Sequence, residues 1–141
     1  MILNGTNNQS VEIKLSDYQF PDKNARDDDW LNIYIDVKSD LGNWRNTDPS
    51  LTVSEFKELI NWFKDLSFNK EVEYPELFFT EPNLGFEYIG DVANEKLIKI
   101  VFSAESKPTS VKNDQEYFVN FQFSNEELAR IAHDLEIELK K

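Results

Sequence analysis

The chain of 141 residues carries a net charge of −12 and no cysteine, and its length suits one domain with one core, expected to span residues 1–141. The lack of cysteine excludes disulfide bonds, thiolate metal sites and cysteine nucleophiles. The acidic charge argues against direct binding to nucleic acid or to an anionic membrane, since both require clustered Lys and Arg side chains, and it favours a basic partner.

The N-terminal part of the chain predicts strands separated by turns. The segment Val11 to Phe20 begins with alternating apolar and charged side chains, as in a half-buried strand. The three aspartates 27–29 predict a solvated turn, because a calcium loop would space its ligands at alternate positions. Trp30 to Val37 predicts a second strand, and residues 41–51 predict a turn leading into a short extended piece around Trp44.

Two segments change to the period of an amphipathic helix, about residues 53–66 and about residues 125–140. Each is preceded by a capping box, in which a hydroxyl residue and a glutamate three positions later bind the backbone at the helix start. We expect both apolar stripes to be buried in one core. Their residues are Phe56, Leu59, Ile60, Phe63, Leu128, Ile131, Leu135 and Leu139.

Four further strands are predicted in the segments "ELFFT", "LGFEYIG", "KLIKIVFS" and "QEYFVNFQF", each bounded by Pro, Gly, Asn or Asp. Short links between neighbouring strands favour hairpins and therefore an antiparallel sheet. Two one-sided helices can cover one face of such a sheet. The sequence therefore predicts a two-layer α+β fold, with a mainly antiparallel sheet of about six strands and both helices packed on one face.

No set of side chains has the pattern of an active site or a metal site. The one histidine, His133, lies away from the centre of the apolar stripe of the last helix, where a surface histidine is the usual case. Zinc requires three or four His, Cys or carboxylate ligands. We therefore expect no catalytic residue, no metal and no cofactor. A hydrolase that uses a pair of carboxylates stays open as an alternative. The sequence indicates no particular pair, because the chain has 27 acidic residues.

Acidic residues are concentrated between Glu71 and Glu95, where there are seven acids and no Lys or Arg. Aromatic residues lie among them, so the segment can offer carboxylates that steer a basic protein and rings that anchor it. Alternatively, the rings face the core and the acids face water. Pro82 and Asn83 suit a hairpin turn that presents these acids. The predicted partner-binding residues are Glu71, Glu73, Glu76, Glu81, Glu87, Asp91 and Glu95.

The order of several segments resembles the WapI family of bacterial immunity proteins. These segments are "DDDWLNIYIDV", the "GNW" turn, "LTVSEFKELINWFKDL", "EPNLGFEY" and "FVNFQFSNEELARIAHDLEIELKK", and they cover about residues 28–140. The most specific part is "EPNLGFE", Glu81 to Glu87. The resemblance implies a non-enzymatic cytoplasmic antidote. It would bind the C-terminal toxin domain of a wall-associated or contact-delivered protein, a domain that cleaves transfer RNA in the name-giving case.

The residues alone leave other functions open. A ligand-binding or scaffold protein whose acidic charge serves solubility would have the same composition. Aromatic residues such as Trp30, Tyr34 or Trp44 could serve a homodimer. The N-terminus lacks the basic and apolar regions of a signal peptide, and no apolar run is long enough to span a membrane. We therefore expect a cytoplasmic protein, in agreement with the absence of disulfides.

Overall fold

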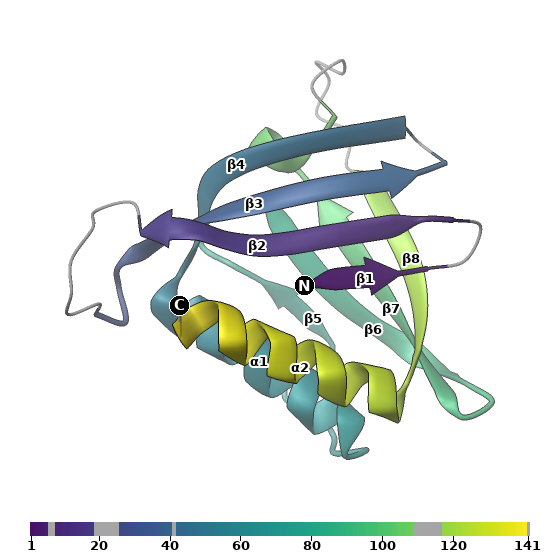
Figure 1. The fold of residues 1–141 in the computed structure, drawn as a ribbon. Helices are drawn as coiled ribbons and strands as arrows, with labels where there is room; N and C mark the ends of the chain where they lie inside the picture. Colours follow the sequence, from purple (N-terminus) through teal and green to yellow (C-terminus); the bar gives the residue numbers. More distant parts are fainter. Residues whose placement is uncertain (6–7, 19–25, 41, 109–116, 141) are drawn as a thin grey trace.

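The structure is a computed structural model that describes residues 1–5, 8–18, 26–40, 42–108 and 117–140. In this part of the chain, two four-stranded antiparallel sheets and two α-helices are formed, and each half has four strands followed by a helix (Figure 1). The first half comprises β1 (Ile2–Asn4), β2 (Ser10–Tyr18), β3 (Trp30–Ser39), β4 (Gly42–Thr52) and α1 (Val53–Ser67). The second half comprises β5 (Glu76–Phe78), β6 (Leu84–Val92), β7 (Glu95–Phe102), the 3₁₀ helix η1 (Ala104–Ser106), β8 (Tyr117–Ser124) and α2 (Asn125–Lys140).

The α+β class is confirmed, but the expectation of a single sheet of about six strands is wrong. Strands β1 to β4 form a first sheet and strands β5 to β8 form a second, each in sequence order. The short strand β1 was not predicted, and of the long strand β4 only a short extended piece around Trp44 was expected. In β4, Pro49 lies opposite Asn32, beside an irregularity in the pairing with β3. A bulge of this kind accommodates a proline that would otherwise argue against a strand.

Both predicted helices are confirmed, and so are their capping boxes. At α1, the Glu55 backbone N–H donates to Thr52 Oγ1 at 3.2 Å, and the Thr52 N–H donates to Glu55 Oε1 at 3.0 Å. Ser124 and Glu127 make the corresponding two bonds at α2, both at 3.1 Å. Of the eight residues expected in the core, seven are buried and Leu139 is partly buried. The local pattern therefore defines both helices well.

The helices do not cover one face of a sheet; they pack together and contact both sheets. Figure 1 shows the two sheets one behind the other, with the helices side by side along one side of them. The ring of Phe63 on α1 meets that of Phe86 on β6 edge to face, with centroids 5.9 Å apart. From α2, Glu138 Oε2 accepts a hydrogen bond from the Leu15 backbone of β2 at 3.2 Å. The helix pair therefore bridges the two sheets.

The inner faces of the two sheets and the apolar faces of the helices contribute to one hydrophobic core. Trp44 on β4 packs edge to face against Phe102 on β7, with ring centroids 5.5 Å apart. Its indole N–H donates to the Ser106 carbonyl of η1 at 2.7 Å. Trp44 is 7% exposed, so its expected availability for a homodimer surface is wrong, while Trp30 and Tyr34 are partly buried. A buried indole with its N–H bonded serves the contact between the sheets.

An ion pair joins the two helices and gives a pH-dependent prediction. The Lys64 ammonium bonds to Glu136 Oε1, and this hydrogen bond lowers the pKa of Glu136 below its usual value. A carboxyl with a lowered folded pKa stabilises the fold above its unfolded pKa, and this contribution is lost as pH falls through the folded pKa. In an NMR titration of Glu136, we expect Lys64→Met to move the midpoint upward, towards the usual glutamate value. Equal midpoints in the two proteins would contradict the assignment.

Candidate functional site

All seven predicted partner-binding acids lie in described segments, and none is buried. They do not form one face, because the fold distributes them over several places. They lie in the loop after α1 (Glu71, Glu73), on β5 (Glu76), in the β5–β6 turn (Glu81), on β6 (Glu87, Asp91) and at the start of β7 (Glu95). The acidic segment therefore divides into a part on the second sheet and a part beside α1.

The acids on the second sheet lie beside a lysine of β7, although the segment from Glu71 to Glu95 contains no Lys or Arg. In the strand register, Glu76 lies opposite Glu87, and Glu87 lies opposite Lys99 of β7. Lys99 Nζ is 3.9 Å from Glu87 Oε2 and 4.5 Å from the centroid of the Phe118 ring. The Lys99 ammonium therefore balances part of the charge of Glu87, its neighbour across the strands, while Glu76 lies one strand further away.

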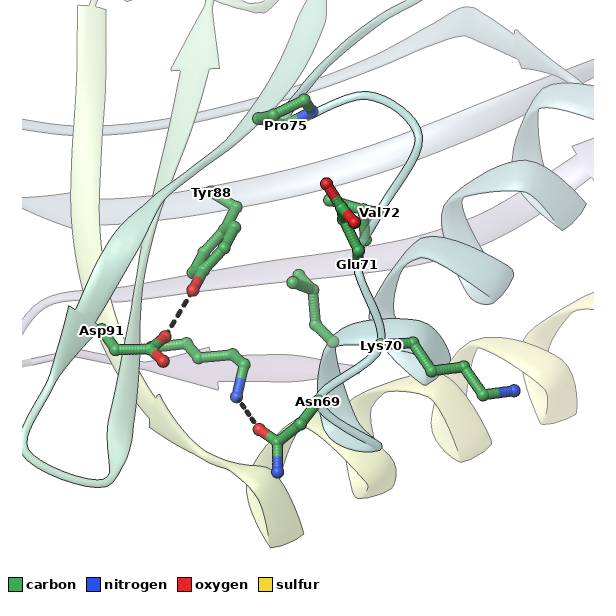
Figure 2. A pocket seen from close by; sticks show the side chains of 9 residues that line it. Asn69, Lys70, Glu71, Val72, Pro75, Tyr88 and Asp91 are labelled. Atoms are coloured by element: carbon green, nitrogen blue, oxygen red, sulfur yellow. Dashed lines mark hydrogen bonds between the residues drawn. The ribbon is translucent and has the colours of Figure 1, made fainter.

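The part beside α1 borders a pocket of about 390 Å³ between the C-terminal end of α1 and β6 (Figure 2). Glu71 and Asp91, which are distant in sequence, both line it. The Tyr88 hydroxyl donates to Asp91 Oδ1, and this bond, with burial and the carboxylate charge, raises the pKa of Tyr88. Lys70 and Lys96 also line the pocket. Two carboxylates and two ammonium groups balance, so the pocket has no strong preference for a cation or an anion.

Lys96 has a structural role at this pocket. Its side chain is buried, and its ammonium donates to Asn69 Oδ1 at 2.6 Å and to Asn125 Oδ1 at 2.8 Å. Asn69 follows α1 with a positive φ of 57°, and Asn125 is the first residue of α2. A buried ammonium requires such hydrogen-bond acceptors. Lys96 therefore ties the end of one helix and the start of the other to β7.

The hairpin turn before β6 is held more firmly than the sequence indicates. Asn83 is 1% exposed, and its side-chain N–H groups donate to Asp48 Oδ2 at 2.7 Å and to Ser50 Oγ at 3.1 Å. On the other side of the turn, the Thr80 backbone N–H donates to Glu55 Oε2 at 2.8 Å. The turn is therefore bonded to β4 and to the cap of α1. The sequence around Pro82 did not indicate that Asn83 is buried, because Asn is also common in exposed turns.

The other candidate groups lie apart from one another in the described part of the chain. His133 is exposed on α2. Asp27–Asp29 lie in a turn, where Asp27 Oδ1 pairs with Lys57 Nζ at 3.0 Å. Glu138, which accepts from the Leu15 backbone, is the one buried carboxylate among the described residues, so no two carboxylates meet there in a buried pair. Those residues also contain no cluster of His, Asp and Glu able to hold a metal ion.

Glu58 of α1 extends the acidic surface beyond the predicted segment. Burial, and then the negative charges of Glu55 and Glu73, raise the pKa of Glu58. Glu58 and Glu73 line a small pocket of about 140 Å³ beside the loop after α1. Sequence reasoning missed Glu58 because it belongs to a regular helix, and only tertiary contact brings it close to Glu73.

Comparison with known proteins agrees with the resemblance seen in the sequence. The family described as immunity protein WapI-like matches residues 1–141, the whole chain. Searches of curated proteins and of solved structures gave no match. In the part of the chain that the structure describes, no helix has the length and apolar character to cross a membrane.

Proposed function

Since the chain belongs to the WapI-like family of immunity proteins, we propose that it binds and neutralises the toxin domain of a large protein encoded beside it, without catalysis. The observation that carries this proposal is the family match over all 141 residues. An immunity role implies a toxin protein as partner. The mode of action would be stoichiometric, with the chain covering the surface that the toxin needs, and it would operate in the cytoplasm.

We further propose that this toxin domain is basic, as a nuclease would be. A nuclease, including one that cleaves transfer RNA, binds phosphate through clustered Lys and Arg side chains. The net charge of −12 and the seven accessible carboxylates between Glu71 and Glu95 are complementary to such a surface. An acidic protein that occupies this surface would exclude the nucleic acid.

The proposal is tested by growth rescue and by a pull-down. Cells that express the toxin domain of the neighbouring gene should stop growing, and co-expression of this chain should restore growth and yield a stable complex. Because no catalytic role is assigned to exposed His133, His133→Ala should protect as well as the natural sequence. Persistent killing in the presence of the folded chain would contradict the proposed function.

Association with a basic toxin should be fast and dependent on salt. Exposed charges steer encounter, and salt screens them over about 8 Å at physiological ionic strength. Combined reversal of Glu81 and Asp91 to Lys should lower the association rate more than it raises the dissociation rate. Stopped-flow measurements across a salt series test this expectation, with thermal melts of each variant as control. An association rate unaffected by salt and by the reversal would contradict the electrostatic part of the proposal.

A further inference from the structure

An apolar row crosses all four strands on the outer face of the second sheet. The register places Phe78, Gly85, Val101 and Phe118 next to one another on β5, β6, β7 and β8. Phe78 is 55% exposed and Phe118 is 45% exposed. Alternation along β7 puts Val101 on the same face as Lys99, and Val101 lies outside the main core although it is buried. The two rings therefore lie at the two ends of one apolar row.

Gly85 lets the Phe78 ring lie against the sheet. A Cβ atom added to Gly85 would come within 2.5 Å of Phe78 Cε1, so any side chain at this position would displace the ring. The ring of Phe78 thus extends from β5 across Gly85 of β6. An aromatic side chain that is already held in place loses little entropy on binding a partner. This apolar row is therefore suited to act as an anchor surface.

The adjacent row determines the charge of the partner that fits this face. It runs Glu76, Glu87, Lys99, Asn120 across the same four strands. Like charges directly opposite one another destabilise a sheet. Lys99 approaches Glu87 from one side, whereas the side-chain carboxylate of Glu76 makes no ion pair or hydrogen bond with any residue of the described segments. A cation brought by a partner would relieve this repulsion.

We propose that the outer face of the second sheet docks the toxin domain, an inference that rests on the proposed function. A long basic side chain of the toxin lays its aliphatic stem on Phe78 and places its charged end between Glu76 and Glu87. Residues two apart on one face of a strand are about 7 Å apart, a separation that suits an amphipathic Lys or Arg side chain. Arg can also stack on an aromatic ring.

Other exposed aromatic residues of the described surface lie outside these two rows. Phe68 is 69% exposed and Tyr74 is 56% exposed, but they lie in the segment after α1, outside the sheet rows. The charges that line the pocket beside α1 balance. A second copy of this chain would bring an identical row with two carboxylates and one ammonium against the first, because a two-fold interface joins identical patches. That arrangement adds repulsion, so a basic partner fits better.

Isothermal titration calorimetry measures the affinity of this chain and its variants for the toxin domain. The toxin domain used is one against which the natural chain protects cells. We expect Phe78→Ser, Phe118→Ser and Glu76→Lys each to weaken binding by about tenfold or more, as for residues at the centre of an interface. Phe68→Ser and Glu73→Lys are matched controls outside the face and should change affinity by less than about threefold. Glu76→Lys removes a like-charge pair, so its thermal melt should show no loss of stability.

The outcomes separate this inference from the proposed function. If the natural chain neither protects nor binds, the proposed function is wrong. If the natural chain binds and both Phe118→Ser and Glu76→Lys bind equally well, the docking face is wrong. An equal loss of affinity with Glu73→Lys would also overturn the docking face, because the effect would then follow from the net charge of the chain and not from the position of Glu76. Light scattering that shows a dimer of the chain, dissociated by Phe118→Ser, would assign the face to a second copy instead.

Discussion

Replacing Phe86 with alanine is expected to lower the free energy of unfolding by about 3–5 kcal/mol, the usual cost of truncating a buried phenylalanine. The Phe86 side chain is fully buried on β6. Its ring meets Phe63 of α1 edge to face at 5.9 Å and Phe79 at 6.3 Å, and it lies 6.3 Å from the ring of Trp62. The truncation would leave a cavity where α1 packs on the second sheet, and these aromatic contacts would be lost with it.

Urea unfolding monitored by tryptophan fluorescence measures this change. For a chain of this size we also expect the melting temperature to fall by roughly 10 °C or more. Phe118→Ala is the matched control, since Phe118 lies on the same sheet but is 45% exposed on its outer face, and its cost should stay within about 1 kcal/mol. Equal losses in the two variants would show that Phe86 is not a principal contact between helix and sheet.

Converting Asn83 to aspartate should destabilise the fold by about 3–5 kcal/mol near neutral pH, as expected for an uncompensated buried charge. The buried Asn83 amide now donates to Asp48 Oδ2 and to Ser50 Oγ. The substitution replaces these donors by a carboxylate next to Asp48. The backbone carbonyl of Asn83 also accepts from the Ser103 backbone N–H at 3.0 Å, so the turn, β4 and the segment before η1 would be loosened together.

The loss should depend on pH in a defined direction. Burial and the nearby Asp48 raise the folded pKa of the carboxyl that Asn83→Asp introduces. Below about pH 4 this carboxyl is protonated in both folded and unfolded chains, so the added cost is small. The cost grows as pH rises through the raised folded pKa and then levels off. Asn94→Asp, in an exposed turn, is the control and should show no such profile. A loss that does not vary with pH would contradict burial of the charge.

The helices were predictable because their determinants are local. The apolar period and a cap such as Thr52 with Glu55 lie within a few residues of each other, and the structure has both. The strands with clear alternation, β2, β3 and β6 to β8, were found for the same reason. By contrast, β1 is too short to show a period, and Pro49 hides β4 until its bulged pairing with β3 is seen.

The two-sheet architecture depended on long-range pairing. The two halves share one order of elements, and in each the last strand leads directly into a capped helix at Thr52 or Ser124, yet no repeat is visible in the sequence. Whether eight strands form one sheet or two depends on contacts between distant residues, such as Trp44 with Phe102. A period of two shows which side of a strand is apolar but does not show what covers it.

By itself, the sequence determined the α+β class, both helices, the family and the concentration of acids between Glu71 and Glu95. These properties follow from composition, short-range period and residue order. Only the tertiary structure decided that the acids divide between a pocket beside α1 and the second sheet, and that Glu76 faces Glu87 beside an apolar row. Cross-strand neighbours are set by register, which depends on core packing and turn geometry far from the acids themselves.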